Sequence, residues 1–298
     1  MEAMTDGCDE LGEEVVRLML AEQFPQWANL EIKEVEHQGW DNRTFRLGDD
    51  LSVRLPSAEG YEPQVDREHR WLPFLAEGLA VPIPSPVAKG APSPRFSRVW
   101  SVYRWLPGEP LVVSQSVDLD QLAADCASFL RSLESLPTPL DAPQPQPSNG
   151  FRGDPFRRYL PEGEAAVAAL DAARQPRALE WMRAAANTTW DRAPVWVHGD
   201  MASGNLLTRD GRLDAVIDFG CMAVGDPACD LTIAWTIFDE PSRERFRHEV
   251  GHHIDTWTRA RGWAVWKAAI TMQAARATSA KLKDAQRTVE ELWRDDAW

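Results

Sequence analysis

Hydrophobic and polar residues follow two different spacings in the first third of the chain. Over 13–23, the apolar residues Val15, Val16, Leu18 and Met19 lie on one face at the period of a helix. Other short runs are rich in β-branched and aromatic residues and are bounded by turn-forming residues, which is typical of strands. The pattern predicts helices over 13–23 and 64–76, strands over 32–36, 43–47, 51–55 and 99–106, and an extended segment over 81–86.

Pro107 and Gly108 end the last strand predicted in the first third of the chain. After them, apolar residues are mostly at helical spacing. Five prolines between Pro137 and Pro147 predict a stiff extended connector. We therefore expect an α+β protein with a small β-rich N-terminal lobe, residues 1–106, and a larger, mainly helical C-terminal lobe, residues 107–298. The helices expected in the second lobe cover 119–136, 162–187, 242–262 and 265–294.

The charge of the chain limits the classes of partner. The 298 residues include 32 Lys and Arg against 46 Asp and Glu, a formal net charge of −14. This excess argues against broad contacts with nucleic acid or an anionic membrane, since both carry charge of the same sign. No apolar run reaches the roughly 20 residues that span a bilayer, and residues 1–10 are too acidic for a secretory leader. We expect a cytoplasmic protein whose partner is a small molecule, cationic or rich in hydroxyl groups.

The cysteines give no indication of a metal or disulfide site. None of the four shows CxxC spacing or histidine partners at zinc spacing. Buried free thiols are therefore expected at Cys8, Cys126, Cys221 and Cys229.

Three oxygen-bearing side chains are expected to meet in the segment 195–235. A buried strand over 195–197 leads into a loop that carries Asp200 and, five residues later, Asn205. Two further strands surround the turn Asp210-Gly211, which is typical of a hairpin. This hairpin would bring Asp218 back beside Asp200 and Asn205.

These residue types suit phosphoryl transfer. Magnesium binds hard oxygen ligands and keeps several waters, so Asn205 and Asp218 together with nucleotide phosphates would form a natural site. Asp200, not tied to the metal, could orient and deprotonate an attacking hydroxyl. His198 is expected to hold the loop backbone rather than to move protons, and Asp226 and Asp230 to cap the helix that starts near Pro227.

The order of these motifs resembles a known family. HGDMASGNLL, VIDFG and GDPACDL are similar to the motifs of the aminoglycoside phosphotransferase family of kinase-like small-molecule kinases. The resemblance implies a bilobed protein-kinase-like fold and a Mg²⁺-dependent transfer from ATP or GTP to a hydroxyl group of a small molecule. An aminoglycoside-type antibiotic would be one such acceptor, with antibiotic resistance as the consequence.

The same resemblance implies nucleotide-binding residues in the first lobe. A kinase-like fold needs a cation on the third strand and a glutamate on the following helix, and Arg54 and Glu68 hold these positions. The segment with Tyr103 and Trp105 would form the hinge that binds the adenine edge, and the loop 37–44, with Gly39 as its one glycine, would cover the phosphates. Read without the family, Arg54 and Glu68 could form an ordinary surface ion pair.

Several alternatives remain at this stage. A non-catalytic nucleotide-binding module has the same fold, and a metal-dependent hydrolase could use His198, Asp200 and Asp218. A kinase could also act on a macrolide, a peptide antibiotic, a sugar, choline or an amino alcohol. A polycationic acceptor would need an acidic pocket, for which the candidates are Asp154, Glu162, Glu164, Asp239 and Glu240, each of which could equally be a solvated charge.

Overall fold

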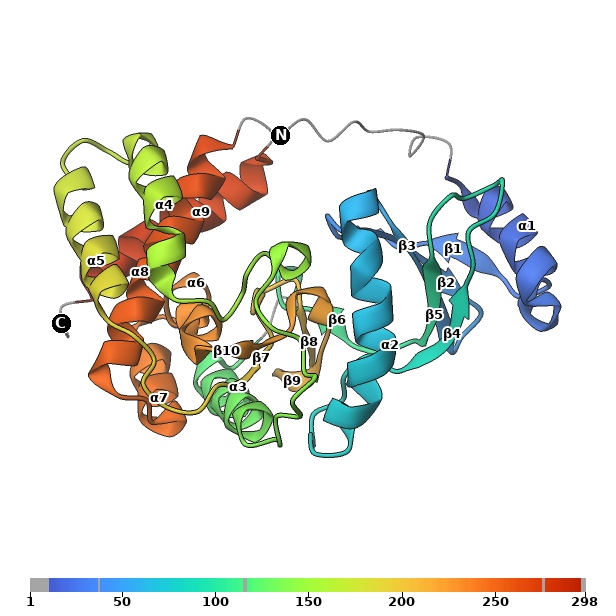
Figure 1. Cartoon of the computed structure of the whole chain (residues 1–298), viewed down its shortest axis with the longest axis horizontal. Helices are drawn as coiled ribbons and strands as arrows, with labels where there is room; N and C mark the ends of the chain where they lie inside the picture. Colours follow the sequence, from blue (N-terminus) through green and yellow to red (C-terminus); the bar gives the residue numbers. More distant parts are fainter. Residues whose placement is uncertain (1–10, 37, 115–116, 275–276, 296–298) are drawn as a thin grey trace. The chain divides into compact units, whose positions relative to one another are not determined.

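The computed structural model describes residues 11–36, 38–114, 117–274 and 277–295 (Figure 1). It divides into two compact units. The first consists of the described parts of Met1–Glu77, Pro82–Pro107 and Ile217–Gly220; the second consists of the described parts of Gly78–Val81, Gly108–Val216 and Cys221–Trp298. The first unit therefore includes the short segment Ile217–Gly220 from the C-terminal half of the chain, and the second includes Gly78–Val81 from the N-terminal third. The roles expected for residues 1–106 and 107–298 stay predictions.

The first unit is built on a five-stranded antiparallel sheet with the strand order β1-β2-β3-β5-β4. Apolar residues at alternate positions of β2 and β3, such as Phe45 and Val53, are buried, and helix α1 covers them with Val16, Met19 and Leu20. Helix α2 packs against β4 and β5 (Figure 1). The elements are α1 Glu13–Gln23, β1 Ile32–Glu34, β2 Asn42–Leu47, β3 Leu51–Pro56, α2 Glu62–Ala76, β4 Pro86–Gly90 and β5 Trp100–Arg104.

Strand β4 was not predicted as a strand. The sequence analysis expected an extended segment over 81–86, whereas β4 begins at Pro86 and pairs with β5 at the edge of the sheet. Its residues Pro86, Ala88, Lys89 and Gly90 have low strand propensity, but an edge strand tolerates proline and lysine. The pairing with β5 overrides the local preference.

The second unit is mainly helical, and α8 lies at its centre. Helix α8 packs against α4, α5 and α9 (Figure 1), and most of its circumference is buried. The helices are α3 Leu119–Glu134, α4 Leu160–Ala166, α5 Gln175–Asn187, α6 Ile233–Thr236, α7 Glu240–Val250, α8 Ile254–Gln273 and α9 Ser279–Arg294. Within the parts that the structure describes, no helix is both long enough and apolar enough to cross a membrane.

Two small sheets carry the loops of the second unit. Strand β7 pairs with β10 in an antiparallel ladder, and β8 lies between β6 and β9 in a three-stranded sheet. The predicted hairpin is present: β8 and β9 are joined by Asp210-Gly211, and Leu206 pairs with Val216. The strands are β6 Glu109–Pro110, β7 Val195–Val197, β8 Leu206–Arg209, β9 Arg212–Val216 and β10 Ala223–Gly225.

The mixed fold with an antiparallel sheet followed by a helical part confirms the predicted α+β class, but several of the predicted helix boundaries in the second unit were wrong. The helix expected over 162–187 is two helices, α4 and α5, separated by residues 167–174, in which Leu170 is extended. The break expected after Gly262 is absent, and the chain instead ends α7 at Val250 and α8 at Gln273. Gly262 lies inside α8 because a Cβ there would collide with Ala185 of α5, so this glycine marks a close helix crossing rather than a helix end.

Candidate active site

The loop after β7 is held by hydrogen bonds to its backbone. The carboxylate of Asp230 accepts the backbone N–H groups of His198, at 2.7 Å, and Gly199, at 2.8 Å. The fully buried ring of His198 accepts the N–H of Asp200 at Nδ1, at 3.2 Å. Gly199 has a φ of 84°, a conformation that favours glycine. Asp200 therefore leaves the loop in a fixed direction.

Asp230 braces this loop from a buried position. Burial raises the pKa of Asp230 to about 6, although His198 and the N–H groups of Gly199 and His198 favour the charged form. Its neighbour in the same motif, Asp226, accepts the N–H of Ala228 at the start of the next helical turn. Asp226 also binds the guanidinium of Arg259 through Nε, at 2.6 Å, and Nη2, at 3.2 Å.

Asp200 and Asn205 lie together in the structure. The side-chain amide nitrogen of Asn205 donates to the carbonyl oxygen of Asp200, at 2.8 Å, and more weakly to its Oδ2, at 3.4 Å. The amide oxygen of Asn205 is thus turned away from this bond and is available as a ligand. Lys267, in α8, donates from Nζ to the other carboxylate oxygen of Asp200 at 3.0 Å.

The surroundings of Asp200 keep it ionised. Burial alone would raise the pKa of Asp200, but Lys267 lowers it, Arg152 and His198 lower it further, and the net pKa is about 2. The carboxylate is therefore negative at any pH at which the protein would be assayed. Sequence reasoning missed both Lys267 and Arg152, and no motif marks either residue.

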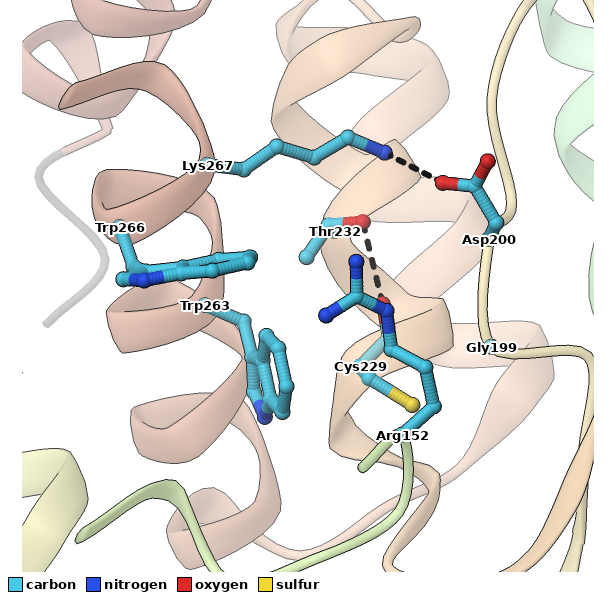
Figure 2. A pocket seen from close by; sticks show the side chains of 8 residues that line it. All are labelled: Arg152, Gly199, Asp200, Cys229, Thr232, Trp263, Trp266 and Lys267. Carbon is cyan, nitrogen blue, oxygen red and sulfur yellow. Dashed lines mark hydrogen bonds and ion pairs between the residues drawn. The ribbon is translucent and has the colours of Figure 1, made fainter. Parts of the chain in front are cut away.

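A small cavity opens beside Asp200 (Figure 2). The guanidinium of Arg152 lies between the carboxylate of Asp200 and the indole rings of Trp263 and Trp266, with its carbon 5.4 and 5.2 Å from the two ring centroids. Lys267 reaches Asp200 from the opposite wall (Figure 2). The cavity is lined by Arg152, Gly199, Asp200, Cys229, Thr232, Trp263, Trp266 and Lys267.

Arg54 joins the predicted residues of the first unit. Its Nη1 donates to both carboxylate oxygens of Glu68 at 3.3 Å, and its Nη2 donates to Oδ1 of Asp218 at 3.0 Å. The hydroxyl of Tyr103 donates to the same glutamate. Burial alone would lower the pKa of Arg54, but Glu68 and Asp218 raise it, so the guanidinium stays charged. Arg54 and Glu68 are largely buried, which rules out an ordinary surface ion pair.

The segment with Tyr103 and Trp105, expected to bind the adenine edge, already has two of its backbone N–H groups hydrogen-bonded within the first unit. The N–H of Arg104 donates to Ser85 and that of Trp105 donates to Asp50, at 2.9 and 2.8 Å. The Trp105 ring carries the guanidinium of Arg46 at 4.8 Å from its centroid. An adenine would therefore have to use the carbonyl groups of this segment or the N–H of Leu106. Of the loop expected over the phosphates, His37 lies outside the described residues.

Asn205 and Asp218 carry the kinds of oxygen donor that Mg²⁺ binds. Asn205 immediately precedes β8, and Asp218 follows two residues after Val216, the β9 residue that pairs with Leu206. Asp218 has a φ of 68°, an uncommon conformation for a residue with a side chain. Within the described ranges, no group of three His, Cys, Asp or Glu could hold a metal by itself. One amide and one carboxylate suit Mg²⁺, which takes its remaining ligands from phosphate and water.

The expected acidic pocket is not part of this cavity. Asp154 pairs with Arg158, Glu164 pairs with Arg183, and Asp239 caps α7. Glu162 accepts the indole N–H of Trp266 at 2.9 Å, and Glu240 is exposed. The cysteines agree with the prediction in part: Cys126 and Cys229 are buried free thiols, Cys221 is half-buried, and Cys8 lies outside the described residues.

Comparisons with solved structures agree with this fold. The aminoglycoside 2'-phosphotransferase-IIIa in its GDP complex is 19% identical, covers 95% of this chain and 99% of its own, and has a TM-score of 0.72. The GDP and kanamycin complex of APH(2")-IIIa is 20% identical over 95% and 98% of the two chains, with a TM-score of 0.70. Macrolide 2'-phosphotransferase MphH from Brachybacterium faecium is 22% identical over 92% and 97%, with a TM-score of 0.62. A search of curated proteins gave no match.

These identities are low enough that the likeness shows the fold alone. The family follows from a separate comparison, in which the model of the phosphotransferase enzyme family, APH, matches residues 31–267. This match covers both the strand with Arg54 and the motifs around Asp200, Asn205 and Asp218. The chain therefore belongs to the phosphotransferase enzyme family, as its motifs predicted, and is a small-molecule phosphotransferase.

Proposed function

We propose that the protein catalyses the Mg²⁺-dependent transfer of the γ-phosphate of ATP or GTP to a hydroxyl group of a small molecule. The observation that carries this proposal is the fork of Arg54, which holds Glu68 and Asp218 at once. A cation on the third strand that is paired with a glutamate of the following helix, beside the aspartate of an Asp-Phe-Gly motif, matches the kinase arrangement that binds nucleotide phosphates next to a metal. Related structures are complexes with GDP, ADP or ATP, which supports a purine nucleotide as donor.

In this reaction the first unit binds the donor. Arg54 would contact the nucleotide phosphates, with Glu68 and Tyr103 holding the guanidinium in place. Asp218 and the amide oxygen of Asn205 would hold Mg²⁺, and the carbonyl groups near Trp105 would contact the base. The metal, when bound, neutralises the charge that develops on the phosphate oxygens.

Asp200 acts on the acceptor. Its carboxylate, ionised at neutral pH, accepts the hydrogen bond of the acceptor hydroxyl and aims the hydroxyl oxygen at the γ-phosphorus. The new O–P bond forms as the bond between the β–γ bridging oxygen and the γ-phosphorus breaks, and the hydroxyl proton passes to Asp200. Because a carboxylate with a low pKa is a weak base, most of its effect comes from orientation, with proton transfer late in the reaction.

A metal-dependent hydrolase that uses His198 is disfavoured by the structure. The His198 side chain has no solvent-exposed surface, and its Nδ1 accepts a backbone N–H of its own loop. It cannot reach a substrate without dismantling the loop that holds Asp200. The non-catalytic binding module remains an outcome of the test below.

The test combines nucleotide binding with turnover. Asp200→Asn should lower acceptor-dependent ADP formation by a factor on the order of 10³, while Mg-ATP still raises its melting temperature as in the wild type. Asp214→Asn, which alters an exposed ion pair with Arg209 on the hairpin, should leave both unchanged. Retained turnover in Asp200→Asn would reject the assigned role, and stabilisation without turnover in the wild type would indicate a binding module.

A further inference from the structure

We infer that the acceptor carries a carboxylate close to the hydroxyl group that is phosphorylated, and that Arg152 binds this carboxylate. This inference rests on the proposed function and narrows its acceptor to one chemical class. It differs from the cationic acceptor that the sequence analysis considered. The observations that carry it are the pairing state of Arg152, the charge of the cavity and the position of both relative to Asp200 (Figure 2).

Arg152 has no acidic partner of its own. Across the residues that the structure describes, no carboxylate lies within ion-pairing distance of its guanidinium, although most other arginines around α8, such as Arg259 and Arg261, have one. The group instead lies over two indole rings that are 3% and 5% exposed. Arg152 is half-buried, and the carboxylate of Asp200, which attracts its charge, is already paired with Lys267, so a bound anion would give the guanidinium a carboxylate of its own.

The charge of the cavity favours an anion. Lys267 already neutralises Asp200 through their 3.0 Å contact. Arg152 is the second cation of the lining and Asp200 its one anion, so the lining carries one net positive charge. A single carboxylate matches this charge and the planar fork of the guanidinium. A polycation would meet Lys267 and Arg152 at the entrance to Asp200, and the acids that could have offset them are engaged elsewhere.

The walls of the cavity strengthen the interaction. Trp263 and Trp266 pack edge to face, with centroids 5.3 Å apart, and Tyr159 packs on both rings. These rings fix the guanidinium and lower the local dielectric, which increases the attraction between Arg152 and an anion. The cavity has room for about one water molecule, so a carboxylate on Arg152 would bind at its mouth and the rest of the acceptor would lie outside it.

Arg152 lies where such an anion would place a hydroxyl at Asp200. The Cβ atom of Arg152 is so close to Gly199 that a side chain at Gly199 would approach it to 2.9 Å. In Figure 2 the guanidinium of Arg152 lies between the two indole rings and the carboxylate of Asp200, and both charged groups line the cavity. A hydroxy acid could therefore contact both, with its carboxylate on Arg152 and its hydroxyl on Asp200.

The first arm of the test measures binding without nucleotide. The melting temperature of the full-length protein is recorded at constant ionic strength with lactate, β-hydroxybutyrate and γ-hydroxybutyrate, and with the amide of each. We expect a saturable rise with at least one acid and none with its amide. The rise should be lost in Arg152→Gln, kept in part in Arg152→Lys, and unchanged in Arg157→Gln, a neighbouring arginine that is exposed. No rise with any acid, or an equal rise in Arg152→Gln, would overturn the inference.

The second arm measures ADP formation with Mg-ATP and the same compounds, together with kanamycin. We expect turnover with an acid, little with its amide or kanamycin, and a KM for the acid about tenfold higher in Arg152→Lys. Turnover with kanamycin that is unaffected by Arg152→Gln would contradict the carboxylate site and support the proposed reaction. An Arg152-dependent rise in melting temperature with no transfer to any compound would support the site and contradict the reaction.

Discussion

The Nζ atom of Lys267, in the central helix α8, lies 3.0 Å from Oδ1 of Asp200, in the loop after β7. The contact joins residues 67 positions apart and holds one oxygen of the carboxylate toward α8. The other oxygen faces the amide of Asn205. Lys267 is thus a positioning residue for Asp200, and it also sets the charge state of that group.

Replacing Lys267 by methionine should change the pH dependence of the reaction. With Lys267 present, the pKa of Asp200 is about 2, so the carboxylate is lost only as the pH falls toward that value. Without the lysine, burial is opposed by fewer charges and the pKa rises. We expect kcat/KM of Lys267→Met to fall on the acid side at a pH where the wild type is still active.

The measurement is kcat/KM from about pH 4 to pH 8, since the ordinary pKa of an aspartate is about 3.9. Lys283→Met, which replaces an exposed lysine of helix α9, serves as the control and should follow the wild type. Superimposable acid limbs in the wild type and Lys267→Met would show that the ammonium does not control Asp200.

Arg54 should distinguish donor binding from acceptor binding. Because its fork contacts Glu68 and Asp218 with different nitrogens, Arg54→Met should raise the KM for ATP by about tenfold or more, with little change in the KM for the acceptor. Arg54→Lys should recover part of the loss, since an ammonium lacks the planar fork. Steady-state kinetics with each substrate varied in turn gives both constants.

The matched control for Arg54 is Arg95→Met, which alters an exposed ion pair with Glu22 in the same unit. Its KM for ATP should stay within about twofold of the wild type, because surface pairs contribute little. An unchanged KM for ATP in Arg54→Met would remove Arg54 from the nucleotide site.

The buried pair of Arg259 and Asp226 should contribute to folding rather than to catalysis. The two side chains are 1% and 4% exposed, so Arg259→Met leaves a buried carboxylate without its partner and should lower the free energy of unfolding by about 3–5 kcal/mol. Asp226→Asn combined with Arg259→Met should cost less than the sum of the single changes. Urea unfolding of the four proteins of this double-mutant cycle gives the coupling.

A surface pair provides the comparison. Arg183→Met, whose partner Glu164 is exposed, should cost less than about 1 kcal/mol. Additive effects at Arg259 and Asp226, or a cost no larger than that of Arg183→Met, would show that the pair contributes no more than a surface contact.

Local sequence patterns were sufficient for the residues that short segments position. The sequence pattern placed Arg54 on a strand and Glu68 on the following helix. In the structure the packing of that helix brings the two side chains into contact. Asp200 and Asn205 share one loop, so their spacing alone fixes their proximity. That Asp218 joins them around a metal stays a prediction.

Residues positioned by tertiary packing could not be found this way. Lys267 is one polar residue in a helix whose other faces are mostly buried, and no spacing indicates that it reaches a loop 67 positions earlier. Arg152 lies in a turn between the proline-rich stretch and α4, in a sequence without a motif. Similarly, the helix break placed after Gly262 was wrong because a glycine that admits a neighbouring helix has the same sequence signature as one that ends a helix.

The ladder of β7 and β10 has a consequence for the acceptor. Strand β7 leads directly to Asp200, and β10 ends at Gly225, whose missing Cβ lets the backbone of Gly153 pack on it while Asp226 donates its N–H to the Gly153 carbonyl at 2.8 Å. Arg152 and Asp200 are therefore attached to one rigid pair of strands. Among hydroxy acids that bind Arg152, the number of carbons between the carboxylate and the hydroxyl would then decide which compound is phosphorylated.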